Sequence, residues 1–151
     1  MDNRLPTIPS GLEATIVRNA TAETLADRLG NPTPANVLAT PVLVAWFEAA
    51  VSQALLPYLP PDVLILGVHI EIDHLRPTPP GHDVTITATL EKQEGNRTQW
   101  RVLAQDESEI IAQGKVRSAL VNQQHFRQRL SAKAKPSPTV TGRRPSGPPL
   151  S

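Results

Sequence analysis

A single long apolar helix constrains the fold of this chain more than any other feature. The segment from Val42 to Leu56 is almost entirely apolar, and Glu48 is the only charged residue between Pro41 and Leu59. Thr40 and Pro41 come directly before it, a capping hydroxyl followed by a proline whose fixed φ suits the first helical turn. A helix that is apolar nearly all round has to lie inside the molecule. We therefore expect the other elements to wrap around it.

After this helix the hydrophobic period changes to that of a strand. The even-numbered residues Leu64, Leu66, Val68, Ile70, Ile72 and His74 alternate with Ile65, Gly67, His69, Glu71 and Asp73. Such alternation predicts a strand with the even-numbered side chains on its core face. Similar patterns predict strands over 12–17, 84–90, 100–105 and 110–122, and short helices over 21–29 and 125–130.

The order of these elements indicates the fold class. The turns at Pro77 to Gly81 and at Glu94 to Asn96 join consecutive strands, and strands joined in this way form an antiparallel sheet. One apolar helix covers one face of such a sheet. We therefore expect an α+β fold in which a five-stranded antiparallel sheet wraps around one long central helix. Because this arrangement leaves strand edges open, we expect a two-fold homodimer, with a tetramer as the alternative assembly.

Composition limits the function classes. The 151 residues suffice for one domain, which we predict over 1–130, followed by a Pro-rich basic tail over 131–151 that we expect to be disordered. There is no cysteine, so disulfide and thiolate chemistry are excluded. A net charge of +1 gives no reason to expect a nucleic-acid or membrane partner. Without a signal-like or bilayer-length apolar segment, we expect a cytoplasmic protein.

Glu48 is the first candidate for chemistry. An ionised carboxylate in a dry apolar site costs several kcal/mol unless it is paired, or else its pKa rises. One explanation is that Glu48 lies in a cleft, where it activates water or attacks a carbonyl. The alternative is a structural role, either on a narrow solvent stripe with Ser52 or in a polar contact.

His74 and Thr40 are the next candidates. By register, His74 continues the face of its strand that meets the helix of Glu48, although a lone histidine there is also consistent with a satisfied core residue. Thr40 has the competing role of helix cap. Thr40 and Glu48 lie about 80° apart around an ideal helix and roughly 12 Å along it, so they do not touch within one helix. If both act on one substrate, one comes from a partner subunit or the ligand spans the gap.

Other chemistries lack support in the sequence. No Gly-rich loop has phosphate-binding spacing, and the four histidines have no paired metal-ligand spacing. We therefore predict no metal and no cofactor.

Several ordered segments resemble a known family. They are Val37-Leu38-Ala39-Thr40 to Glu48-Ala49-Ala50, Leu66-Gly67 to His74, and Thr78-Pro79-Pro80-Gly81 followed by Val84-Thr85-Ile86-Thr87-Ala88. Together they resemble the fluoroacetyl-CoA thioesterase-like branch of the hot-dog superfamily, over about Leu12 to Leu130. The resemblance implies a hot-dog fold and hydrolysis of an acyl-CoA thioester, with coenzyme A as part of the substrate.

The same resemblance assigns roles to residues. It implies that Thr40, Glu48 and His74 form the catalytic set and that Gly67 lies beside the acyl group. The family's namesake has a gating phenylalanine shortly before the threonine, where this chain has Pro34-Ala35-Asn36. The resemblance therefore implies a small acyl group without indicating which one. Two alternatives are a non-catalytic hot-dog protein that binds an acyl-CoA or another hydrophobic ligand, and a purely structural dimer.

Overall fold

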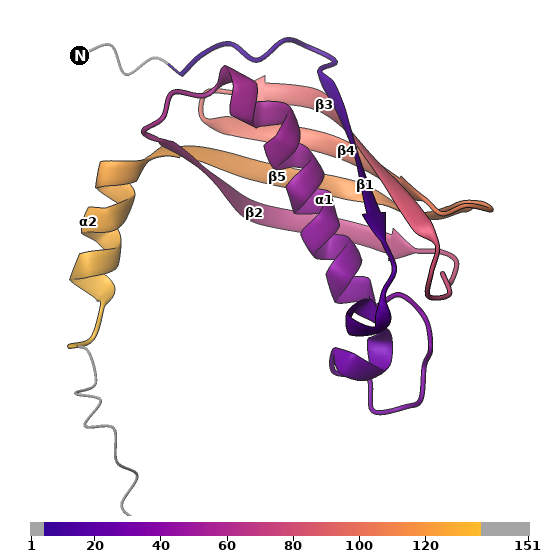
Figure 1. The fold of residues 1–151 in the computed structure, drawn as a ribbon. Helices are drawn as coiled ribbons and strands as arrows, with labels where there is room; N and C mark the ends of the chain where they lie inside the picture. Colours follow the sequence, from indigo (N-terminus) through magenta and orange to yellow (C-terminus); the bar gives the residue numbers. More distant parts are fainter. Residues whose placement is uncertain (1–4, 137–151) are drawn as a thin grey trace, which may run out of the picture.

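The computed structural model describes residues 5–136, in which a curved sheet packs against one long helix (Figure 1). The elements in chain order are β1 (Glu13–Asn19), the 3-10 turns η1 (Ala22–Thr24) and η2 (Ala26–Arg28), α1 (Thr40–Leu55), the 3-10 turn η3 (Leu56–Tyr58), β2 (Val63–His74), β3 (Asp83–Glu94), β4 (Arg97–Gln105), β5 (Ile110–Asn122) and α2 (Gln123–Lys133). The sheet has five antiparallel strands, and α1 lies across its concave face. The predicted hot-dog arrangement is confirmed.

The strand order differs from a simple succession of hairpins. The order is β1-β3-β4-β5-β2, so β2 pairs with β5 and not with β3, which follows it in the sequence. The segment after His74 therefore crosses from one side of the sheet to the other. As a result β2, a strand of 12 residues, forms one edge of the sheet.

A β-bulge divides β2 into two halves. The register against β5 shifts between Gly67 and His69, so Val68 is an extra residue in the ladder. Ile65 packs against the core before the bulge, and Ile70 and Ile72 do so after it. The prediction that the even-numbered residues share one face is therefore wrong for the first half of β2, because the inserted residue reverses the alternation.

The helix α1 buries one face, not its whole surface. Its buried residues are Leu43, Phe47, Ala50, Val51, Ala54 and Leu55, which join Trp100 and the inward side chains of β3, β4 and β5 in the core. Pro41, Ala45 and Glu48 are exposed in the single chain. The helix contacts β1 and β3 more extensively than β2, so its side toward the β2 edge is less covered.

The terminal segments differ from the predictions in detail. The region predicted as a helix over 21–29 forms the two 3-10 turns, which are followed by Gly30 with φ +91°. The C-terminal helix continues to Lys133. Most of the tail that we expected to be disordered, residues 137–151, lies outside the described residues, so that expectation stays a prediction. Over residues 5–136, no helix combines the length and apolar character needed to cross a bilayer.

The close pairing of β5 with β2 makes Gly114 sensitive to substitution. A Cβ on Gly114 would overlap the carbonyl oxygen of Glu71 in β2. We expect Gly114→Ala to lower the free energy of unfolding by about 2–3 kcal/mol, measured by urea denaturation, because the two strands must move apart. Gln113→Ala, at the exposed neighbouring position, should change it by less than about 0.5 kcal/mol. Equal effects of the two substitutions would contradict this packing.

Candidate active site

Thr40 and His74 form a side-chain pair at the start of α1. The N-cap residue of α1 is Ala39, and no side chain caps the helix, so the expected capping role of Thr40 is wrong. Instead, Oγ1 of Thr40 lies 2.7 Å from Nδ1 of His74. His74, at the end of β2, lies on the same side of the bulge as Ile70 and Ile72, which face the helix. The structure thus brings together two of the predicted site residues.

The environment of His74 favours a neutral imidazole. Burial lowers the pKa of His74 below the usual 6.5. A hydrogen bond with the backbone of Arg76 raises the pKa again, but by less than burial lowers it. Within the described chain, its Nε2 is buried and has no hydrogen-bond partner. A buried polar atom without a partner costs free energy unless another group satisfies it. One ring nitrogen therefore faces Thr40, and the other is available to a group from outside this chain.

Glu48 lies against the backbone of β2. A Cβ built on Gly67 would lie 2.8 Å from Oε1 of Glu48, so any larger residue there would require the carboxylate to move from this position. The bulge at Val68 is what turns Gly67 toward α1. Glu48 is, however, exposed in the single chain, so the expectation of a buried carboxylate is not met there.

The four predicted residues therefore form two separate pairs in one chain. Thr40 with His74 marks the start of α1, and Glu48 with Gly67 lies two turns further along, roughly 12 Å by helix geometry. This separation agrees with the expectation from residue spacing.

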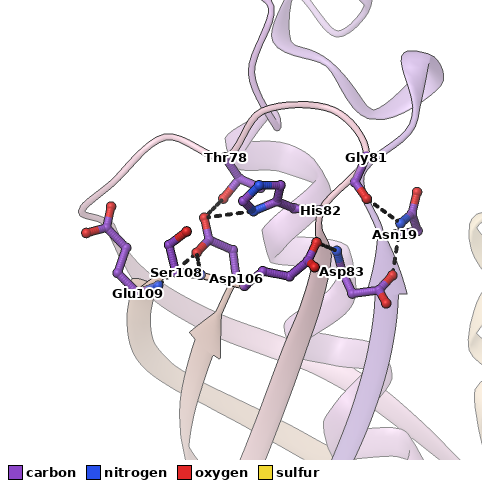
Figure 2. A network of polar contacts seen from close by, with 9 residues as sticks. Asn19, Thr78, Gly81, His82, Asp83, Asp106, Ser108 and Glu109 are labelled. Atoms are coloured by element: carbon purple, nitrogen blue, oxygen red, sulfur yellow. Dashed lines mark hydrogen bonds and ion pairs between the residues drawn. The ribbon is translucent and has the colours of Figure 1, made fainter.

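Figure 2 shows a polar network around Asp106 that the sequence analysis did not identify. Thr78 is fully buried, and its Oγ1 donates a 3.0 Å hydrogen bond to Oδ2 of Asp106. Oδ1 of Asp106 accepts hydrogen bonds from the backbone N–H groups of Ser108 and Glu109, at 2.8 and 2.9 Å. Nδ1 of His82 is 3.8 Å from Oδ2 of the same carboxylate.

This network connects the segments that carry Thr40 and His74. The backbone N–H of Leu38, two residues before Thr40, donates to the carbonyl oxygen of Thr78 at 2.8 Å. The N–H groups of Leu75 and Arg76, directly after His74, donate to the carbonyl oxygen of Ile111 at 2.7 and 3.2 Å. Asp106 and Ile111 belong to the same β4–β5 hairpin region. That hairpin therefore positions both partners of the Thr40–His74 pair.

Comparisons with known proteins agree on one family. The sequence profile described as FlK, fluoroacetyl-CoA-specific thioesterase, matches residues 20–124. The fluoroacetyl-CoA thioesterase of Streptantibioticus cattleyicolor is 38% identical over 97 residues, which are 64% of this chain and 70% of that protein.

Solved structures give the same result. A structure of the fluoroacetyl-CoA thioesterase FlK matches with a TM-score of 0.79 and 30% identity, over 85% of this chain and 99% of that chain. A thioesterase superfamily member from Thermus thermophilus matches with a TM-score of 0.76 and 30% identity, over 84% of this chain and 96% of that one. A threonine-to-serine variant of FlK, also similar to this chain, was solved in complex with acetyl-CoA.

The charge of Asp106 should make the fold sensitive to acid. Burial by itself would raise the pKa of Asp106, but hydrogen bonds from Ser108, Glu109 and Thr78, with the nearby His82, lower it below the usual 3.8. The ionised carboxylate therefore stabilises the fold at neutral pH, and this contribution is lost as the pH falls through the lowered pKa. Asp106→Asn should cost about 1–2 kcal/mol at pH 7 and less at pH 3.

The measurement is urea denaturation across this pH range. Asp27→Asn, at an exposed position, serves as the control and should follow the wild-type curve. A cost of Asp106→Asn that is independent of pH would show that the carboxylate charge is not what stabilises the hairpin.

Proposed function

The chain belongs to the fluoroacetyl-CoA-specific thioesterase family and is a thioester hydrolase, and we propose that it hydrolyses the coenzyme A thioester of a small acyl group in a cleft shared by two subunits. The observation that carries this proposal is the 2.7 Å pair of Thr40 and His74 at the start of α1, with the second imidazole nitrogen left without a partner among residues 5–136. The binding of acetyl-CoA by a variant of FlK supports a small acyl-CoA as the substrate class.

The proposed chemistry uses each residue in one role. The hydroxyl of Thr40 and the first backbone amides of α1 lie where they can orient the thioester carbonyl and stabilise the oxyanion that forms on it. The carboxylate of Glu48 acts on the carbonyl carbon, by direct attack or through a water molecule. In direct attack the C–S bond breaks and leaves a mixed anhydride on Glu48, which water then hydrolyses; in the other route the water oxygen itself forms the new bond to the carbonyl carbon. Either route consumes one water, His74 assists proton transfer to the departing thiolate, and the products are the carboxylic acid and free coenzyme A.

Two uncovered surfaces support a two-fold dimer through β2. The outer edge of β2 is 12 residues long, and an unpaired edge of that length readily pairs with another strand. The exposed stripe of Pro41, Ala45 and Glu48 on α1 has only one charged residue. Pairing of two β2 edges in an antiparallel dimer would bring two such helices onto the same face of a continuous sheet.

The same pairing would bring the Glu48–Gly67 pair of one subunit toward the Thr40–His74 pair of the other. Gly67 is four positions from the start of β2 and seven positions, about 23 Å, from His74 in its own strand. With two β2 strands fully overlapped, Gly67 of one would lie about 13 Å along the sheet from His74 of the other. Glu48 of one subunit would then lie about as far from the imidazole of its partner as from its own, so that a substrate held between two subunits could meet a Glu48 and a Thr40–His74 pair from different chains.

The acyl pocket is proposed beside Gly67. The absence of a side chain there lets the carboxylate of Glu48 lie directly against the backbone of β2, where a bound acyl group would meet both. The segment before Thr40 has Pro34-Ala35-Asn36 and no phenylalanine. We therefore propose a small acyl group without assigning fluoroacetyl specificity.

The first test is a panel of short acyl-CoA thioesters with wild type and Glu48→Gln, followed by thiol release. Wild type should hydrolyse at least one member, and Glu48→Gln should reduce kcat/KM by at least about 100-fold on it, since the amide cannot act as nucleophile or base. Glu23→Gln, at another exposed acid, should have wild-type kinetics. Equal activity of Glu48→Gln and wild type on every hydrolysed substrate would remove Glu48 from the mechanism. Ligand-induced thermal stabilisation without thiol release would favour the non-catalytic binding protein.

The second test asks whether the site is shared between subunits. Glu48→Gln and His74→Ala are each expected to be inactive, but equal mixtures that have exchanged subunits should recover about a quarter of the wild-type rate, because half of the dimers then contain one intact site out of two. Light scattering should give a dimer for both variants and for wild type. Absence of recovery after proven subunit exchange would mean that both residues act within one subunit.

A further inference from the structure

We propose that a groove beside α2 binds the nucleotide end of coenzyme A, with its adenine and phosphate groups. The groove, called the α2 groove below, has a volume of about 760 Å³ and lies between the sheet residues Leu66 and Val121 and the helix residues Phe126, Arg129, Leu130 and Lys133. This size is within the usual range for small-molecule sites. The inference rests on the proposed function, because it takes an acyl-CoA as the substrate.

The α2 groove differs from three other hollows of the described surface in having no carboxylate in its lining. Its lining includes Arg129, Lys133 and His125 but no aspartate or glutamate. The other three contain Glu94, Asp62, and the pair Glu71 and Asp73. The hollow with Glu94 also has Lys92, Arg97 and Arg117, but there a carboxylate lies among the cations and no aromatic ring lines the wall. The whole of α2, Gln123–Lys133, also has no acidic residue. A positively charged site attracts the diphosphate and the 3′-phosphate of coenzyme A.

The walls of the α2 groove also suit a purine ring. Phe126 is half-buried and Leu130 is 50% exposed, so an apolar surface faces solvent beside the cations. Arg129 and Lys133 are four residues apart, which puts them on the same side of the helix. An aromatic ring with guanidinium and ammonium groups next to it allows adenine to stack while the phosphates are paired.

The position of α2 connects the α2 groove to the proposed active site. α2 begins directly after Asn122, which pairs with Val63 at the start of β2. In Figure 1, α2 continues from the end of β5 at one end of the sheet, the end at which β2 begins. Antiparallel pairing of two β2 edges would bring the start of one strand next to the end of the other, where His74 of the second subunit lies. The α2 groove of one subunit would thus bind the nucleotide of a coenzyme A molecule whose thioester lies in the active site of the other subunit. The pantetheine arm would connect the two.

The charge of the chain itself argues against two other occupants. The segment beyond Pro136 has Arg143 and Arg144 and no acidic residue, so it does not neutralise the α2 groove. A second α2 in the same groove would bring further cations against Arg129 and Lys133. An anionic ligand removes this repulsion, whereas a second copy of the chain increases it.

The test measures binding of coenzyme A and of pantetheine, which lacks the nucleotide, by calorimetry on the full chain. Arg129→Gln combined with Lys133→Gln should weaken coenzyme A binding at least about tenfold and leave pantetheine binding unchanged, because the phosphates lose their partners. Arg127→Gln is the matched control, since Arg127 lines the hollow that contains Asp62 on another side of α2. It should weaken coenzyme A binding less than twofold. Arg129→Lys should retain most of the affinity.

Four results would overturn the inference. The double variant could bind coenzyme A as tightly as wild type does, which would show that Arg129 and Lys133 do not bind it. It could also weaken binding no more than Arg127→Gln does, which would show only a general electrostatic attraction to α2. It could weaken coenzyme A and pantetheine equally, which would indicate a structural effect. It could dissociate an oligomer larger than the dimer in light scattering, which would make the α2 groove a contact between copies. If wild type hydrolyses no thioester but binds coenzyme A in a manner that depends on Arg129, the groove inference stands and the proposed reaction fails.

Discussion

The β-bulge at Val68 is the constraint on which the arrangement of the site depends. A regular strand of alternating side chains would turn Gly67 and His74 to opposite faces, because seven positions separate them. The extra residue reverses the alternation once, so that Gly67 meets the carboxylate of Glu48 and His74 meets the hydroxyl of Thr40. One inserted residue thus lets a single strand supply both a glycine and an imidazole to the same helix.

The sequence predicted the parts of the fold that depend on long periodic patterns. The apolar run before Pro57 predicted α1 to within two residues, and β5 was predicted with its observed bounds. The bulge was not predicted, because its cause is a register between two strands that are distant in the sequence. The strand order was also missed, since the turn residues from Pro77 to Gly81 are as compatible with a crossover as with a hairpin.

The candidate site was predicted in its residues more than in its contacts. Glu48 was identified as an isolated charge in an apolar helix, and the expectation that it does not touch Thr40 in one chain agrees with the structure. The cap assignment for Thr40 failed because a hydroxyl one residue inside a helix is no longer placed to accept from the first turn, and His74 offers it another partner. Thr78 was named only as part of a family segment, and nothing in the sequence indicated its bond to Asp106, although the Asp106-Glu107-Ser108 sequence is typical of a turn in which aspartate accepts backbone N–H groups.

The contact between Gly67 and Glu48 limits how this site can change. In most pockets a methyl group added to the wall reduces the volume for the ligand and leaves the reacting groups where they are. Here the first carbon of any side chain at Gly67 would meet the carboxylate itself. If Glu48 acts as proposed, a substitution at Gly67 changes the space beside the acyl group and the position of the reacting carboxylate together, so the size of the accepted acyl group and the rate of its hydrolysis are coupled at this position.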